Sequence, residues 1–152
     1  MQKTIRYTQE GYDNLLLEEK DLTAKRISAV VEVKRTREMG DLSENSAYRA
    51  AKWQLGGIDR RLRQIKNLLD KAFVVQSRND GYIGIGSYVE LEVNSEKVKY
   101  EVVGGMESDI RNGKISERSP LGKALIGRRK GETVNVFTPS GLAEYKIVDI
   151  TV

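Results

Sequence analysis

An apolar seam in the first half of the chain repeats with heptad spacing. Its members are separated alternately by four and three residues: Ala51, Leu55, Ile58, Leu62, Ile65, Leu69 and Ala72. A seam of this kind is typical of a helix that packs lengthwise against another helix. We therefore predict a helix from about Glu44 to Lys71 that requires a helical partner.

The partner is predicted just upstream, between Thr8 and about Met39. This segment contains no proline, its only glycine is Gly11, and Thr8 can cap its start. A rougher apolar stripe runs along it through Leu15, Leu22, Ala29 and Val33, with Ile27 and Val30 beside it. Because Gly40 leaves only a short loop, we expect an antiparallel coiled-coil hairpin that buries both stripes. Helices of this length measure about 40 to 48 Å, so the hairpin is expected to project as a rod.

After about Phe73 the pattern changes to that of a small α+β domain. Alternating apolar and polar residues predict strands at 87–93, 98–103, 133–138 and 144–152. Between them, Ser119 and Pro120 provide an N-cap and a first helical residue, and Gly127 provides a stop. The sequence therefore predicts two domains: a helical hairpin at 1–75, with its turn at 40–45, and an α+β domain at 76–152.

The residue composition excludes several kinds of active site. The chain has no histidine and no cysteine, which removes the commonest general base, the usual zinc ligands and any disulfide framework. Chemistry would therefore use carboxylates, Lys, Tyr or a hard cation such as Mg²⁺. No apolar run approaches the roughly 20 residues that span a bilayer, and the first residues lack the core of a secretory signal, so we expect a cytoplasmic protein. The net charge of +4 mildly favours acidic partners.

Two carboxylates, Asp41 and Glu44, fall at the predicted hairpin turn. A turn has no pocket walls to tune them, and two ligands are too few for a protein-only Mg²⁺ site, because Mg²⁺ prefers octahedral oxygen coordination. The pair is therefore interpreted as part of a metal site that another molecule completes. The alternative interpretation is helix capping, with Asp41 or Ser43 as the N-cap of the second helix.

Two motifs, in this order, resemble the Gre family of transcript cleavage factors of bacterial RNA polymerase. The first is Gly40-Asp41-Leu42-Ser43-Glu44-Asn45, followed by Tyr48, Ala50 and Ala51. The second is Ile115-Ser116, continued by Ser119-Pro120-Leu121-Gly122-Lys123-Ala124-Leu125-Ile126-Gly127. The resemblance covers essentially the whole chain, and the two motifs together are more specific than either alone.

The resemblance implies a coiled-coil N-terminal domain that enters the secondary channel of the polymerase. It also implies an FKBP-like C-terminal domain that docks on the coiled coil at the channel rim through a segment containing Ser119 and Pro120. Asp41 and Glu44 would act catalytically by helping to hold a weakly bound Mg²⁺ ion that the polymerase completes, so that backtracked RNA is cleaved near its 3′ end. Arg118 departs from the acidic or amide residue common in the family, and Glu117 is the nearest substitute charge.

Basic and aromatic residues flank the predicted turn. Arg37, Arg49 and Lys52 are candidates for contacts with RNA phosphates, but a solvated helix face with interspersed glutamates has the same composition. We expect Tyr48 to cover the hairpin core. Trp53 is expected to pack or to lie exposed rather than to stack on a base.

Three functions remain open at this point. In the first, the chain is a monomer that binds RNA polymerase and the nascent RNA 3′ end and stimulates the polymerase's own cleavage, without being an enzyme itself. In the second, a Gre homologue occupies the channel and inhibits, although the ordinary spacing of Asp41 and Glu44 favours stimulation. The third is prolyl isomerisation, suggested only by the implied fold. This activity would need an apolar pocket lined by aromatic residues. The aromatic residues after Phe73 are Tyr82, Tyr88, Tyr100, Phe137 and Tyr145, and we expect most of them to lie in the core.

Overall fold

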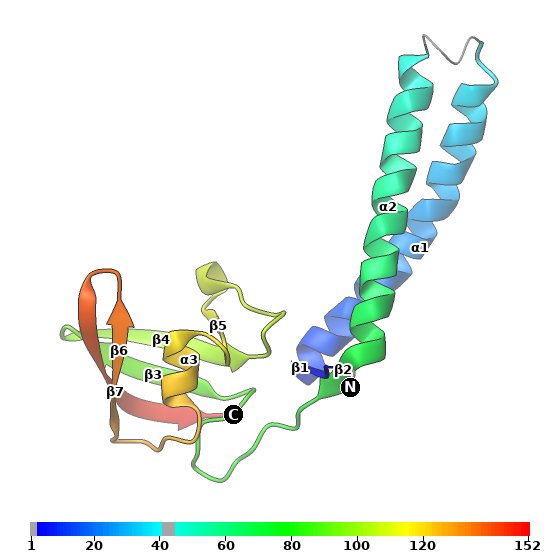
Figure 1. The fold of residues 1–152 in the computed structure, drawn as a ribbon. Helices are drawn as coiled ribbons and strands as arrows, with labels where there is room; N and C mark the ends of the chain where they lie inside the picture. The colour runs from blue at the N-terminus through cyan, green and yellow to red at the C-terminus, as the bar shows by residue number, and fades with distance from the viewer. Residues whose placement is uncertain (1–2, 41–44) are drawn as a thin grey trace. The chain divides into compact units, whose positions relative to one another are not determined.

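The computed structural model describes residues 3–40 and 45–152, which form two compact units (Figure 1). The first unit is a helical hairpin made of Asp13–Lys71. The second joins residues up to Tyr12 with Ala72–Val152 and contains the sheet. Within the described ranges, no helix is both long enough and apolar enough to cross a membrane. The predicted class, a helical hairpin followed by an α+β unit, is confirmed.

Two long helices, α1 (Gln9–Arg37) and α2 (Ser46–Lys71), lie antiparallel in the hairpin (Figure 1). The side chains buried along the pair are Leu15, Ala29, Thr36, Ala51, Ile58 and Ile65. Two ion pairs cross from one helix to the other, Glu18 to Arg61 and Arg26 to Asp59, each with an N–O distance of 2.6 Å. From the first pair to the second, the α1 residue advances from Glu18 to Arg26 while its partner on α2 moves back from Arg61 to Asp59, as antiparallel packing requires.

The heptad seam of α2 faces α1 as predicted. Ala51, Ile58 and Ile65 are buried, and the seam residues that alternate with them, Leu55, Leu62 and Leu69, are half-buried. The last predicted member, Ala72, lies beyond the helix and begins strand β2 (Ala72–Val74). Gly56 and Gly57 do not interrupt the helix; the Arg60 guanidinium lies over them, 3.4 Å from where a Cβ of Gly56 would be.

The prediction for the first helix was wrong at two positions. Leu15 and Ala29 are buried and Leu22 and Val33 half-buried, as expected, but Ile27 is 68% exposed and Val30 40% exposed. At 3.6 residues per turn, Ile27 lies on the side of the helix opposite Ala29, so it cannot reach α2. The helix therefore carries apolar residues on two faces.

A five-stranded sheet forms the body of the second unit, in the order β5-β4-β3-β7-β6 (Figure 1). The strands are β3 (Tyr88–Val93), β4 (Glu96–Val103), β5 (Lys114–Ser116), β6 (Thr133–Thr138) and β7 (Gly141–Thr151). Neighbours are antiparallel except β4 and β5. Helix α3 (Pro120–Leu125) packs against this sheet, and its Leu125 is buried with Leu91, Val102 and Ile147 in the core. The single-turn helix η1 (Ile110–Asn112) precedes β5.

The start of the chain belongs to the sheet unit through a small second ladder. Strand β1 (Ile5–Tyr7) pairs in parallel with β2, with Ile5 opposite Ala72 and Tyr7 opposite Val74. These three-residue strands, and β5, were not predicted, because strands this short carry too few alternating residues to be recognised. Thr8 caps α1 as predicted, since its hydroxyl accepts a 3.0 Å hydrogen bond from the Gly11 N–H.

Glu107 fixes that cap to the sheet unit. Its carboxylate accepts hydrogen bonds from the Thr8 N–H at 2.8 Å, the Thr8 hydroxyl at 2.5 Å and the Gly104 N–H at 3.1 Å. A Cβ on Gly11 would lie 1.9 Å from the Glu107 carboxylate, so a larger residue at position 11 would displace that carboxylate. The first turn of α1 is thereby held by a residue almost one hundred positions later in the chain.

Candidate functional sites

The predicted metal-binding pair, Asp41 and Glu44, lies outside the described residues. The structure describes the chain on both sides of it. On one side α1 ends at Arg37 and is followed by a turn in which the Met39 N–H donates to the Thr36 carbonyl at 3.2 Å. On the other side α2 begins at Ser46. The chain is therefore described as far as Gly40 after α1 and again from Asn45 before α2.

Asn45 joins these two ends. Its side-chain Nδ2 donates to the Thr36 carbonyl at 2.7 Å, and its Oδ1 accepts from the Tyr48 N–H at 3.0 Å. The second bond is that of an N-cap, since it satisfies an N–H of the first turn of α2 that has no partner within the helix. The N-cap of the second helix is thus Asn45, and not Asp41 or Ser43 as the capping alternative proposed.

The three predicted RNA-contact residues lie in the turns nearest these helix ends and are exposed. Arg37 is the last residue of α1, while Arg49 and Lys52 lie in the first two turns of α2. The Lys52 ammonium sits 5.2 Å from the centre of the Tyr48 ring, within the range of a cation–π contact. Tyr48 is half-buried, so it covers part of the hairpin and also supports Lys52.

Trp53 is an exposed aromatic and not a packing residue of the hairpin. Its side chain is 78% exposed, and the Arg60 guanidinium lies 5.9 Å from its ring centre. Arg60, Arg63 and Gln64 line a shallow depression beside Gly57 on the same helix. The outward face of α2 therefore combines positive charge with one aromatic ring.

The predicted docking segment forms a tightly hydrogen-bonded turn before α3. The Ser119 hydroxyl donates to the Ser116 carbonyl at 2.7 Å and accepts from the Gly122 N–H at 3.0 Å, which is the predicted N-cap. Pro120 follows at the first helical position and is exposed. A Cβ on Gly122 would lie 2.0 Å from the Ser116 carbonyl oxygen, so this turn depends on glycine. Local geometry thus presents Pro120 at the surface on a rigid support.

The acidic residue beside this segment, Glu117, is already paired. Glu117 forms an ion pair with Arg6 at 3.2 Å, and its side chain is only 13% exposed. Glu117 therefore does not offer a free carboxylate that could stand in for the acidic or amide residue expected at position 118. An apolar groove of about 360 Å³ opens next to Glu117 and is lined by Ile83, Ile85 and Ile126 among others.

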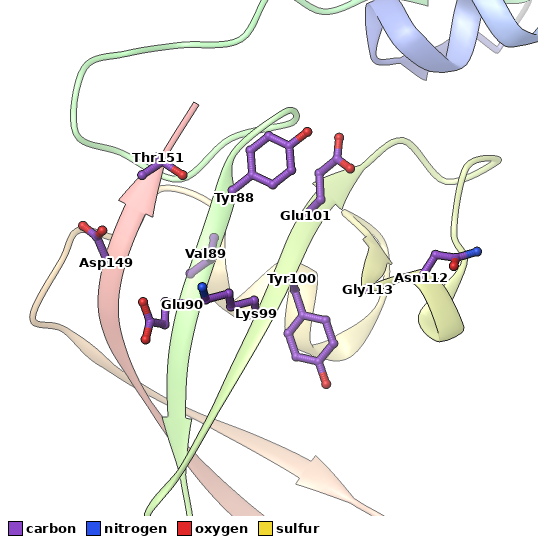
Figure 2. A pocket seen from close by; sticks show the side chains of 10 residues that line it. All are labelled: Tyr88, Val89, Glu90, Lys99, Tyr100, Glu101, Asn112, Gly113, Asp149 and Thr151. Carbon is purple, nitrogen blue, oxygen red and sulfur yellow. The ribbon is translucent and has the colours of Figure 1, made fainter.

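A second depression, of about 310 Å³, lies on the face of the sheet formed by β3, β4 and β7 (Figure 2). Tyr88 and Glu101 are directly opposite on neighbouring strands, and their side chains extend to the same side in Figure 2. Burial raises the pKa of the Glu101 carboxyl above its ordinary value, and the Glu101 charge in turn raises the pKa of the Tyr88 hydroxyl.

The lining of this depression does not suit a prolyl isomerase. Besides Tyr88 and Tyr100 it includes Glu90, Lys99, Glu101 and Asp149, so it is charged rather than apolar. The expectation that most aromatics are core residues is only half right. Tyr100 and Tyr145 pack against the core, but Tyr88 is 47% exposed and Phe137 84% exposed.

Among residues 3–40 and 45–152 there is no group of three or more acidic side chains placed to hold a metal ion. Carboxylates in this part of the chain are engaged in ion pairs and hydrogen bonds, as those of Glu18 and Glu107 are.

Two family models match consecutive parts of the chain. Residues 5–74 match the N-terminal domain of transcription elongation factors, and residues 78–152 match the C-terminal domain of the transcription elongation factors GreA/GreB. The chain is 40% identical over 157 residues to transcription elongation factor GreA of Thermosipho melanesiensis, with both chains covered to 100%. It is 39% identical over 155 residues to GreA of Pelobacter propionicus, covering 99% of this chain and 98% of the relative.

Solved structures give a weaker likeness. GreA factor homolog 1 (Gfh1) of Thermus thermophilus is 29% identical, with a TM-score of 0.47, covering 99% of this chain and 100% of its own.

Proposed function

The chain belongs to the GreA/GreB family of transcription elongation factors, and we propose on that basis that it binds bacterial RNA polymerase and stimulates cleavage of backtracked nascent RNA. The observation that carries the proposal is the pair of carboxylates, Asp41 and Glu44, between two helix ends that Asn45 ties together. Two carboxylates are too few ligands to bind Mg²⁺ by themselves, so the pair suits a metal site that a partner protein completes.

The donor set suits a hard cation. Asp41 and Glu44 offer carboxylate oxygens, and the chain has no histidine or cysteine that would favour a softer metal. A Mg²⁺ ion shared between these carboxylates and the polymerase would stabilise charge on the attacking and leaving oxygens of the RNA phosphodiester. The role of this chain is to deliver two ligands, while the polymerase holds the substrate and performs the cleavage.

Positive charge at the hairpin end fits an RNA partner. Arg37, Arg49 and Lys52 are exposed next to the helix ends, where they can neutralise phosphates of the displaced RNA 3′ segment. These contacts would favour binding without selecting a sequence. They supply affinity for the substrate, and the carboxylates supply the metal ligands.

Docking is assigned to the sheet unit. Pro120 is exposed at the start of α3, and the neighbouring apolar groove can accept an aliphatic side chain of the polymerase rim. The Ser116, Ser119 and Gly122 hydrogen bonds hold Pro120 in place before binding, so little conformational freedom is lost on docking.

The test is a halted, backtracked elongation complex to which the purified chain is added. Wild type should shorten the transcript in a Mg²⁺-dependent reaction, and the double variant Asp41→Ala/Glu44→Ala should lose this stimulation while still competing for polymerase binding. Glu38→Ala removes a nearby exposed carboxylate and serves as the control that should keep full activity.

The same assay distinguishes a defect in docking from a defect in cleavage. Pro120→Ala should raise the concentration needed for half-maximal cleavage and leave the rate at saturation unchanged. Slower elongation without any transcript shortening would identify an inhibitor of the same family and would refute the proposal. Unchanged cleavage by the double variant would refute the role of Asp41 and Glu44.

A further inference from the structure

Positive charge flanks the turn formed by Ser119 and Pro120. Arg118 comes directly before this turn, and Lys123 lies three residues after Pro120 on α3, close to the same side of the helix. Both basic side chains are exposed. In the described part of the chain, no carboxylate forms an ion pair with either of them. The two charges are therefore available to a partner.

Two acidic side chains in this region serve the chain itself. Glu117 is only 13% exposed and pairs with Arg6. The Glu107 carboxylate accepts hydrogen bonds from Thr8 and from the Gly104 N–H. Both acids are thus engaged within the sheet unit, and the exposed charges beside the turn are basic. Charge complementarity therefore favours an acidic partner surface.

Arg118 is held in place before a partner arrives. Its backbone N–H donates to the Ser116 hydroxyl at 3.0 Å. Its side-chain stem passes over Gly105, where a Cβ would lie 3.3 Å from the Arg118 Cδ and 3.5 Å from its Nε. A side chain that is already packed loses little conformational freedom on binding. The planar guanidinium can donate two parallel hydrogen bonds to one carboxylate, a geometry that a lysine ammonium cannot reproduce.

We propose that Arg118 receives a carboxylate of the polymerase when the sheet unit docks, and that it selects polymerases that are acidic at this contact. The inference rests on the proposed function, because it names the chemistry of the surface that the docking segment meets. Arg118 takes no part in cleavage and determines which surface the turn can bind. A basic surface would bring like charges together and would be rejected. Lys123 adds attraction as a point charge without fixing the orientation.

Equilibrium binding of the full chain to core RNA polymerase from the same organism, free of nucleic acid, tests the proposal. Arg118→Glu should raise the dissociation constant at least about tenfold at low salt and leave the cleavage rate at saturating factor unchanged. Arg118→Lys should raise the dissociation constant by a smaller factor, because it keeps the charge and loses the planar fork. The control is Arg111→Glu, the same change at an exposed arginine of η1, which should bind as wild type does.

A second experiment identifies the group on the polymerase. A carbodiimide joins a lysine amine directly to a carboxylate, so the variant Arg118→Lys/Lys123→Gln should form a cross-link from position 118 to an Asp or Glu of the polymerase. The change at Lys123 removes the neighbouring amine. Replacing the polymerase carboxylate by lysine should weaken the binding of wild type and restore the binding of Arg118→Glu.

The outcomes separate this inference from the proposed function. If wild type binds and stimulates cleavage while Arg118→Glu binds equally well, the inference is overturned and the proposed function stands. If wild type does not bind the polymerase at all, the proposed function fails and the inference fails with it. If Arg118→Glu binds core polymerase normally but loses affinity for the elongation complex, Arg118 contacts a nucleic-acid phosphate and the inference is overturned. Failure of the exchanged charges to restore binding would exclude a direct contact.

Discussion

At the scale of single residues, Asn45 carries two contacts that hold the helix ends of the hairpin. Asn45→Ala removes the acceptor of the Tyr48 N–H and the donor to the Thr36 carbonyl. We expect a loss of about 1 to 2 kcal/mol in the free energy of unfolding of the hairpin, the usual cost of deleting an N-cap. Urea unfolding and faster hydrogen exchange at the Tyr48 and Arg49 amides would measure it.

Asn45→Asp separates the two contacts. Aspartate caps helices as well as asparagine does, so the bond from Tyr48 should survive while the Thr36 carbonyl loses its donor. In this variant the hydrogen-exchange protection of the Tyr48 and Arg49 amides should therefore lie between that in wild type and that in Asn45→Ala. Equal protection in all three proteins would contradict the role given to this residue.

Part of this site could be predicted from single residues. The exposure of Arg37, Arg49 and Lys52 was predictable because charged residues near a helix end tend to be exposed, while their contact with RNA stays a prediction. The Ser119 cap was predictable because a serine before a proline is a strong N-cap signal. Asn45 was missed, although asparagine directly before a run without glycine or proline is the same kind of signal. Asp41 and Ser43 in the adjacent segment competed for the cap, and sequence alone does not rank them against Asn45.

At the scale of the helices, the cross-hairpin ion pairs make stability depend on pH. The hydrogen bond from Arg61 lowers the pKa of Glu18 below its ordinary value of 4.5. A carboxyl whose pKa is lowered in the folded state stabilises that state above its ordinary pKa, and this stabilisation is lost as pH falls through the folded pKa. Acidification should therefore destabilise wild type more than Glu18→Gln, measured by urea unfolding followed by circular dichroism at 222 nm. Added salt should shrink the difference, because both side chains are partly exposed.

Glu101 in the sheet unit provides a comparison of opposite sign. Its pKa is raised by burial, so its contribution to stability is present below its ordinary value of 4.5 and is lost as pH rises through the folded pKa. Glu101→Gln should be more stable than wild type at neutral pH and equal to it in acid. The same direction of effect in Glu18→Gln and Glu101→Gln would contradict these assignments.

The elements that could be predicted are those with long periodic patterns. The α2 seam, the strands at 88–93 and 133–138 and the capped α3 all follow from side-chain spacing. The strands β1, β2 and β5 could not be found, since their partners are set by tertiary contacts and each has only three residues. The two apolar faces of α1 blurred its period, which led to Ile27 being assigned to the wrong face.

At the scale of the whole molecule, α1 passes without a break from the sheet unit into the hairpin, and Glu107 holds its first turn on the sheet unit. Glu107→Ala leaves the buried Thr8 N–H and hydroxyl without their acceptor, which should cost about 1 to 3 kcal/mol locally. Hydrogen exchange should quicken at the Thr8 and Gly104 amides and stay unchanged at Leu91 in the core. The matched control, Glu117→Ala, breaks only the ion pair with the exposed Arg6 and should have little effect.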